Sequence, residues 1–208
     1  MAYVLGFIVA DGSLIKNKRG ACFLELTSTD KEIIYKIRRV LQSNLAIGEY
    51  QPRNKNYKRR YRIQIGSKKI FGDLLKLGIT QNKSKTIKLP KIPQDYFADF
   101  LRGYFDGDGS VNVCLYKKKS HKKPSIILSC GFVSGSKSLL KKIRKILLSR
   151  GIVRGGTLYY YDNGYRLWFS INDSSSLFGF MYGKLSSDLF LKRKKKVFEK
   201  FFDIRKKH

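Results

Sequence analysis

The sequence predicts an α+β fold made of two tandem halves related by a pseudo-twofold axis, each with the element order αββαββα. Two observations carry this prediction. A nine-residue motif occurs twice, as VLGFIVADG at residues 4–12 and LRGYFDGDG at residues 101–109, and further segments repeat at a similar offset. A period of about a hundred residues with only two copies is typical of a domain pair and not of a solenoid.

The repeat continues outside the motifs. KIRRVL at residues 36–41 matches KIRKIL at 142–147, and YRIQI at 61–65 matches YRLWF at 165–169. The offset changes along the chain, so loops between the shared elements carry insertions. We therefore expect an N-terminal half over residues 1–79, a linker over 80–95 that contains two prolines, and a C-terminal half over 96–208 with a basic C-terminal helix.

Apolar periodicity and turn residues predict the elements of the first half. They are a helix up to residue 10, strands over 13–18 and 21–28, a helix over 30–42, strands at Tyr50 and over 57–65, and a helix over 68–77. Gly78 is expected to end the last of these helices.

The second half repeats the order. Its predicted elements are strands over 111–117 and 125–134, a helix over 137–149, strands over 156–161 and 165–171, and helices over 174–182 and 191–205. The sequence Asp162-Asn163-Gly164 is a strong signal for a hairpin turn. A basic loop, Lys117 to Lys123, joins the first two strands.

Each motif reads as a short helix with two small residues four positions apart. These are Gly6 and Ala10 in the first copy and Gly103 and Gly107 in the second. Residues four apart lie on one face of a helix, so the two motif helices are able to pack almost backbone to backbone.

An acid followed by a helix-stopping glycine ends each motif. Asp11 and Asp108 fall where the helix macrodipole is already negative, and bringing both helix ends together concentrates negative charge. Such a site favours a divalent cation with hard oxygen ligands, for which magnesium is the best candidate. The alternative is two ordinary buried helices, each with an Asp-Gly C-cap.

Strand alternation separates a core face from an exposed face. Tyr61, Ile63 and Ile65 are expected in the core, as are Tyr165, Leu167 and Phe169, and Val111, Val113 and Leu115. The opposite face is basic, amide-bearing and aromatic, which suits base edges in a DNA major groove. The alternative is a merely solvated strand face. The candidate DNA contacts of the strands and their loops are Asn17, Arg60, Arg62, Gln64, Asn112, Tyr116, Arg154, Arg166 and Trp168.

The charge of the chain indicates a polyanionic partner. There are 44 Lys and Arg against 15 Asp and Glu, a net charge of +29, which is far more than solubility needs. The apolar content of 42% is sufficient for a packed core. The longest apolar run is too short for a membrane span, and nothing resembles a signal peptide, so we expect an intracellular protein, cytoplasmic, nucleoid-associated or organellar, and not a secreted one. Cys22, Cys114 and Cys130 form no CxxC pair and are expected to pack as small apolar groups.

The two motifs, with LPKIP at 89–93 and DGSV at 108–111, resemble the LAGLIDADG homing endonucleases in their single-chain, two-motif form. Two positions depart from the motif: Val9 replaces its first acid, and Arg102 stands at an alanine position. The resemblance places the catalytic, metal-binding acids at Asp11 and Asp108, and not at Asp106. The backbone carbonyls of Ala10 and Gly107 are the further expected metal ligands.

The family also places a basic residue near the scissile phosphates after the last helix of each half. The matching residues are Lys83 and Lys194, expected to polarise phosphate or order the attacking water. The alternative is that these lysines, like most in such runs, contact only phosphate or solvent.

The resemblance implies a monomer that makes a staggered double-strand break in DNA by magnesium-dependent hydrolysis at a long recognition site. Mn²⁺ is expected to substitute for Mg²⁺, and Ca²⁺ to bind without supporting cleavage. An intron-RNA maturase, bound to its host intron RNA, or a non-cleaving DNA-binding protein are alternatives on the same fold. A ribosome-associated basic protein would explain the charge but not the paired Asp-Gly motifs. Because the chain starts at the first motif, a free-standing enzyme is expected in preference to an intein-embedded one.

Overall fold

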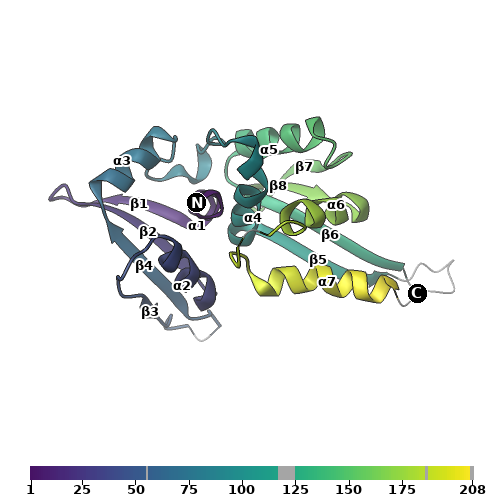
Figure 1. Ribbon diagram of the computed structural model, residues 1–208, viewed down its shortest axis with the longest axis horizontal. Helices are drawn as coiled ribbons and strands as arrows, with labels where there is room; N and C mark the ends of the chain where they lie inside the picture. Colours follow the sequence, from purple (N-terminus) through teal and green to yellow (C-terminus); the bar gives the residue numbers. More distant parts are fainter. Residues whose placement is uncertain (55, 117–124, 186, 207–208) are drawn as a thin grey trace.

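Two four-stranded antiparallel sheets, one in each half, flank a central pair of helices (Figure 1). The structure is a computed structural model that describes residues 1–54, 56–116, 125–185 and 187–206. The strand orders are β1-β2-β4-β3 in the first sheet and β5-β6-β8-β7 in the second, so the two halves have the same topology. The predicted α+β fold with two repeated halves is confirmed.

The elements follow the predicted order with small shifts at their ends. The first half contains α1 (Ala2–Asp11), β1 (Gly12–Lys16), β2 (Cys22–Ser28), α2 (Lys31–Val40), β3 (Gly48–Tyr50), β4 (Arg60–Gly66) and α3 (Lys68–Lys76). Two 3₁₀ turns follow, η1 (Lys83–Lys85) and η2 (Gln94–Tyr96). The second half contains α4 (Phe97–Asp108), β5 (Gly109–Tyr116), β6 (Ser125–Ser134), α5 (Lys137–Ser149), β7 (Thr157–Tyr161), β8 (Gly164–Phe169), α6 (Ile171–Tyr182) and α7 (Lys192–Lys206).

The two motif helices, α1 and α4, lie side by side at the centre of the molecule (Figure 1). Their contact leaves no room for side chains at the motif glycines. A Cβ atom on Gly6 would lie 2.0 Å from the carbonyl oxygen of Phe100, and one on Gly103 would lie 2.0 Å from that of Tyr3. At Gly107 it would lie 2.3 Å from the Cβ of Ala10. The small residues therefore bring the two backbones into direct contact.

Each sheet buries one face against helices and leaves the other face open. Ile63 on β4 is buried with Ile33 and Ile37 of α2, and Leu167 on β8 is buried with Ile143 of α5. The helix α7 adds a further layer in the second half, where it runs along β5 (Figure 1). Its Phe198 packs against Phe105 of α4, with ring centroids 5.9 Å apart.

The hairpin between β7 and β8 turns more tightly than predicted. Asp162 and Asn163 adopt φ values of 51° and 59°, as a two-residue turn with the twist of its flanking strands requires. The third predicted turn residue, Gly164, already pairs with Tyr161 in the sheet.

The predicted core position of Leu115 is wrong. Leu115 is 67% exposed and Cys114 is also exposed, and both lie near the tip of the β5–β6 hairpin, past the part of β6 that pairs with β8. β8 pairs with β6 only from Cys130 to Ser134. Of the three cysteines, only Cys130 is fully buried. The basic loop Lys117 to Lys123 lies outside the described residues.

Within the described part of the chain, no helix is long and apolar enough to cross a membrane.

Candidate active site

The two motif acids meet where α1 and α4 end. α1 ends at Asp11 and α4 at Asp108, and each is followed by a glycine in extended conformation. The Asp11 carboxylate reaches across to the other helix, with Oδ2 3.2 Å from the position that a Cβ on Gly107 would take. The acids of two motifs 97 residues apart in sequence therefore share one site.

The site carries unfavourable negative charge. The pKa of Asp108 is raised to about 7, first by burial and then by the charge of Asp11, while Lys194 and Lys83 oppose the shift. Burial also raises the pKa of Asp11, again against Lys194 and Lys83. Burial raises the pKa of both carboxyl groups, and the charge of Asp11 adds to the shift at Asp108, so a cation bound between them would stabilise their ionised forms.

Lys194 is bound to the C-terminal end of α4. Its Nζ donates to the carbonyl oxygens of Phe105 (2.6 Å), Asp106 (2.7 Å) and Gly109 (2.7 Å), and lies 3.4 Å from that of Gly107. Only 6% of Lys194 is exposed. Burial lowers its pKa to about 8, against the opposing charge of Asp106. The ammonium group therefore satisfies carbonyls that the helix end leaves without partners.

Lys83 has the corresponding position in the first half. It lies in η1, only 7% exposed, and its Nζ donates to the carbonyl oxygen of Gly12. Burial lowers its pKa, while Asp108 and Asp11 oppose the shift. The linker between the halves thus contributes one buried lysine side chain, that of Lys83, to the site.

The donor atoms around the two acids fit a hard cation that keeps some of its waters. Among the described residues, no group of three or more His, Cys, Asp and Glu is placed to hold a metal ion. A cation here would have two carboxylates and nearby backbone carbonyls, and its other ligands would come from water or substrate. Mg²⁺ accepts such a ligand set.

A polar cavity of about 350 Å³ opens beside Asp11. Its wall includes Gly107 of α4, Arg60 of β4, Arg193 of α7 and the segment 27–30. Arg193 crosses between the halves, since its guanidinium donates to both carboxylate oxygens of Asp30 at 2.8 to 3.1 Å. The cavity therefore connects Asp11 with the open face of the first sheet.

On the first sheet, the candidate DNA contacts Arg60, Arg62 and Gln64 are all exposed. An acid that the sequence pattern did not single out lies among them. Glu25 of β2 accepts a hydrogen bond from Gln64 (3.3 Å) and lies 3.6 Å from the guanidinium of Arg62. Strand alternation would have placed Glu25 on this face, because it pairs directly with Gln64.

On the second sheet, the candidates differ in exposure. Asn112 and Tyr116 of β5 are exposed. The Arg166 guanidinium lies 4.6 Å from the ring centroid of Tyr161, a cation–π contact. Trp168 is half-buried because its ring covers Gly131 on β6, where a Cβ would lie 2.3 Å from a ring carbon.

The two remaining candidates lie in loops. The side-chain oxygen of Asn17 accepts the N–H groups of Arg19 (3.0 Å) and Ala21 (2.9 Å) and so shapes the β1–β2 turn. Arg154 precedes β7, and its N–H donates to Asp173 of α6 at 2.8 Å. The structure therefore groups the strand candidates on two sheet faces and leaves these two outside them.

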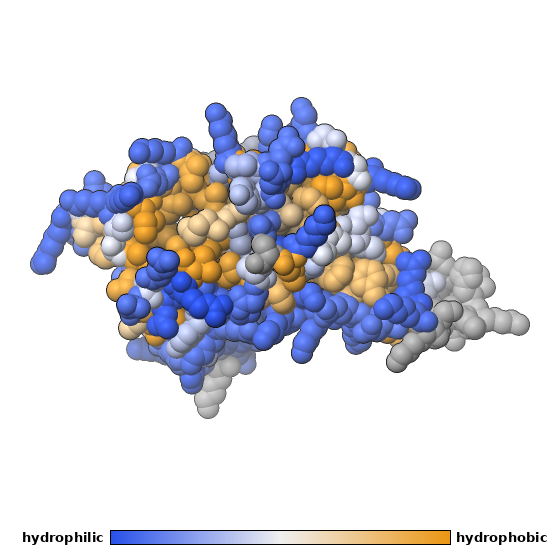
Figure 2. All heavy atoms as spheres, viewed as in Figure 1, coloured by the Kyte–Doolittle hydropathy of each residue, from blue (hydrophilic) through white to orange (hydrophobic). Residues whose placement is uncertain are grey.

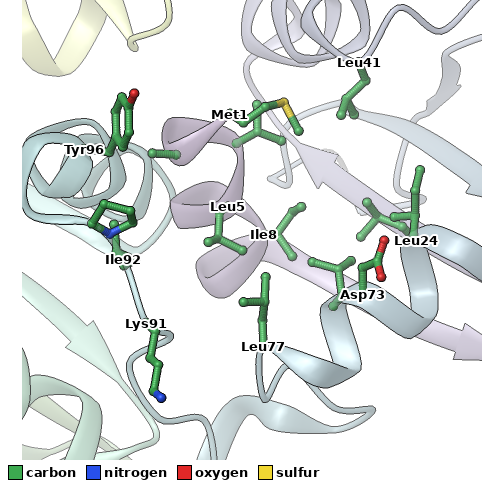
Figure 3. A pocket seen from close by; sticks show the side chains of 15 residues that line it. Met1, Leu5, Ile8, Leu24, Leu41, Asp73, Leu77, Lys91, Ile92 and Tyr96 are labelled. Carbon is green, nitrogen blue, oxygen red and sulfur yellow. The ribbon is translucent and has the colours of Figure 1, made fainter.

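An apolar pocket of about 600 Å³ lies away from the acids. It is lined by Leu5 and Ile8 of α1, Leu24, Leu77 and Ile92 (Figure 3). Figure 2 shows this apolar area over α1 and α3 with hydrophilic residues around it. Asp11 and Asp108 do not line the pocket, so the acid site is separate from it.

Comparisons with known proteins agree with this geometry. The family model described as a LAGLIDADG-like domain matches residues 1–77 and 95–176. An uncharacterized protein of Methanocaldococcus jannaschii is 26% identical over all of this chain and 73% of its own length. The DNA-directed RNA polymerase subunit Rpo1C of that organism is 30% identical over 53% of this chain, which spans only 12% of that subunit.

Solved structures share the fold at low identity. I-AabMI, a LAGLIDADG meganuclease bound to uncleaved DNA, is 15% identical with a TM-score of 0.61, over 98% of this chain and 89% of that one. I-SmaMI bound to cleaved DNA is 16% identical with a TM-score of 0.60, over 99% and 87%. I-SmaMI bound to its uncleaved target in the presence of calcium ions is 14% identical with a TM-score of 0.59, over 98% and 89%. The family model covers well over half of the chain, and this chain therefore belongs to the LAGLIDADG family, as its two motifs predict.

Proposed function

We propose that this protein is a homing endonuclease that makes a staggered double-strand break in DNA at a long recognition site by magnesium-dependent hydrolysis. One observation carries the proposal. Asp11 and Asp108 meet at the junction of the two halves, with the buried Lys83 and Lys194 beside them. A protein that only binds DNA gains nothing from two carboxylates close to phosphates, because they repel the backbone.

The acids are the proposed cation ligands, together with the backbone carbonyls of Ala10 and Gly107. A bound Mg²⁺ would supply an activated water and stabilise charge on the leaving oxygen. Lys83 and Lys194 offset negative charge at the two helix ends, and their proposed role is to stabilise charge that develops on each scissile phosphate. Each lysine contacts the end of one motif helix, Lys83 at Gly12 and Lys194 at Gly109, so we assign one lysine to each DNA strand.

The open sheet faces are the proposed DNA-binding saddle. We take residues 1–79 and 96–208 as the two modules, each reading one side of the target. Arg62, Gln64, Asn112 and Arg166 are candidates for base contacts, and most other cations would contact phosphates. DNA-bound I-AabMI and I-SmaMI support a double-stranded target and a monomer, and hence a protein that acts inside the cell where DNA is.

The proposed cofactor is Mg²⁺, with Mn²⁺ as a substitute. I-SmaMI with uncleaved DNA in the presence of calcium ions supports the further proposal that Ca²⁺ binds without promoting cleavage. Both proposals follow the preference of carboxylate and carbonyl oxygens for hard cations.

A library of duplex sites tests this function directly. The purified protein is incubated with the library in Mg²⁺ and, separately, in Ca²⁺, and the cut and retained molecules are sequenced. We expect one family of sites to be cut in Mg²⁺ and retained in Ca²⁺. Retention without cutting in Mg²⁺ would identify a non-cleaving DNA-binding protein, and preference for structured intron RNA over every duplex would identify a maturase.

A further inference from the structure

Asp106 is a buried acid that the proposed chemistry does not use. It lies in α4, two residues before Asp108, and is only 2% exposed. Its Oδ2 accepts two hydrogen bonds, from the N–H of Leu191 (2.8 Å) and from the hydroxyl of Tyr3 (2.7 Å). Its Oδ1 lies 3.4 Å from the hydroxyl of Tyr182. A carboxylate buried with this many donors has a fixed position.

The bond to Leu191 connects Asp106 with the beginning of α7. Leu191 is the residue before α7, and its carbonyl accepts the N–H of Lys194 at 3.1 Å. Lys194 thus lies one helical turn beyond the residue that Asp106 holds. The position of Leu191 determines which lysine of the run Lys192 to Lys196 faces the end of α4.

Arg102, one helical turn before Asp106 in α4, also contacts the chain that leads into α7. It is 1% exposed, and it donates from Nε to the carbonyl of Leu189 (3.0 Å) and from Nη1 to that of Met181 (2.7 Å). Its remaining nitrogen pairs with Asp99. Arg102 therefore holds both the end of α6 and the chain just before α7.

The first half has no such anchor and does not need one. Leu5 and Val9 occupy the motif positions of Arg102 and Asp106. From the end of α3 to Lys83 the chain runs seven residues, whereas from the end of α6 to Lys194 it runs twelve. The turn at Lys83 is local, since its carbonyl accepts the N–H groups of Thr86 (2.9 Å) and Ile87 (2.8 Å). A longer connection has more conformations, so its end must be held by other contacts.

We propose that Asp106, supported by Arg102, is the positioning residue that sets where α7 begins and thereby places the Lys194 ammonium on the end of α4. The inference rests on the proposed function only where it concerns cleavage. Loss of Asp106 displaces Lys194 and leaves Lys83 in place, so the second half alone is affected. Cleavage of the two strands then becomes unequal.

Chemical labelling of lysines tests the placement without any need for activity. The folded protein is treated briefly with an amine-acylating reagent, and the modification of Lys194 and Lys83 is measured by mass spectrometry in the same sample. In Asp106→Val, which installs the side chain found at position 9, labelling of Lys194 is expected to rise about tenfold, the equivalent of one lost buried hydrogen bond. Labelling of Lys83 should stay as in the parent.

Two variants serve as controls. Asp106→Asn keeps an amide oxygen for Leu191 and Tyr3, so it should restore the low labelling of Lys194. Tyr3→Phe removes the other donor to the same oxygen and leaves the bond to Leu191, so it should also label like the parent. Unchanged Lys194 labelling in Asp106→Val, or an equal rise at both lysines, overturns the proposal.

Two further measurements complete the test. If Asp106→Val does not fold, Arg102→Met replaces it, and labelling of Lys194 but not of Lys83 should still rise; no rise overturns the proposal. In strand-resolved cleavage assays, Asp106→Val and Lys194→Met should both produce nicked DNA, with the same strand left uncut. The double variant should cleave no more slowly than Lys194→Met. Equal slowing of cleavage on both strands, or a double variant whose loss of rate is the sum of the two single losses, contradicts the inference. A parent protein that never cleaves DNA refutes the nuclease function. The labelling result then decides by itself whether Asp106 places Lys194.

Discussion

Lys83 and Lys194 make the same contact in the two halves of the molecule. Each ammonium group donates to the carbonyl oxygen of the glycine that directly follows the motif acid, Gly12 in the first half and Gly109 in the second. One lysine reaches this place from a 3₁₀ turn and the other from the first turn of a long helix. The pseudo-twofold relationship therefore extends from the backbone to the charged groups of the site.

Removing either motif acid should abolish double-strand cleavage. Asp11→Asn or Asp108→Asn takes away one proposed cation ligand at the shared centre, so cutting of both strands is lost while DNA binding stays largely intact. Gel assays of cleavage and binding at matched Mg²⁺ concentrations measure this. Asp106→Asn is the control, and its loss of cleavage activity should be far smaller. Full cleavage by either motif variant would refute the catalytic assignment.

The stability of the metal-free protein should fall as the pH rises from about 4 to about 7. The pKa of Asp108 is raised to about 7 in the folded state, so in this window the folded protein binds more protons than the unfolded chain. Added Mg²⁺ competes with that proton, and its effect on Tm should grow between about pH 6 and about pH 8. Thermal unfolding across this pH range measures both effects. In Asp108→Asn the Mg²⁺ effect should be small and flat, and a parent with the same flat response would contradict the shared site.

DNA affinity should depend steeply on salt. With a net charge of +29 and a long saddle, we expect about ten phosphate contacts and a slope of log K against log salt near −9. Fluorescence titrations on the preferred site at several salt concentrations give the slope. A value shallower than about −3 would leave most of the charge unexplained by duplex binding. Substituting one lysine of the loop Lys117 to Lys123 should weaken all sequences alike and reduce the slope by about one.

Arg62→Ala and Arg166→Ala should each relax discrimination at a few neighbouring base pairs, at a cost of about 1–3 kcal/mol on the preferred site. Both arginines lie on the open sheet faces, beside Glu25 and over the ring of Tyr161 respectively. Sequencing of cleavage sites for each variant gives the profile. Glu25→Gln should alter the base pairs contacted by Arg62 and by Gln64, because Glu25 contacts both side chains. A uniform loss of affinity with the parent profile would mean that these strands contact only the backbone.

Gly6→Ala and Gly103→Ala should destabilise the fold by about 1–3 kcal/mol or more, because the added Cβ would overlap a backbone oxygen of the other motif helix. Gly72→Ala is the matched control, a glycine in α3 with open space around its Cβ position. It should stabilise the protein by about 0.5–1 kcal/mol. Urea unfolding compares the three variants, and equal stability of all three would contradict the close packing of α1 and α4.

The sequence by itself determined the order of elements and the two-half plan. The predicted helix over 137–149 has these bounds in the structure, and the alternation of Arg62, Ile63 and Gln64 places them on the expected faces. Such features are local, because periodicity and turn residues act over a few positions. The repeat also predicted that the two motif helices pack together, because similar sequences in the two halves form the same elements.

Only the tertiary structure decided which polar groups are buried together. Leu115 alternates like a core residue but is exposed, because it lies near the tip of a hairpin that extends past the rest of its sheet. Asp106 is held by Tyr3, 103 residues away, and by Leu191, 85 residues away. A run of five basic residues gives no local sign of which one turns inward. That choice depends on contacts between segments distant in sequence, and these exist only when the chain has folded.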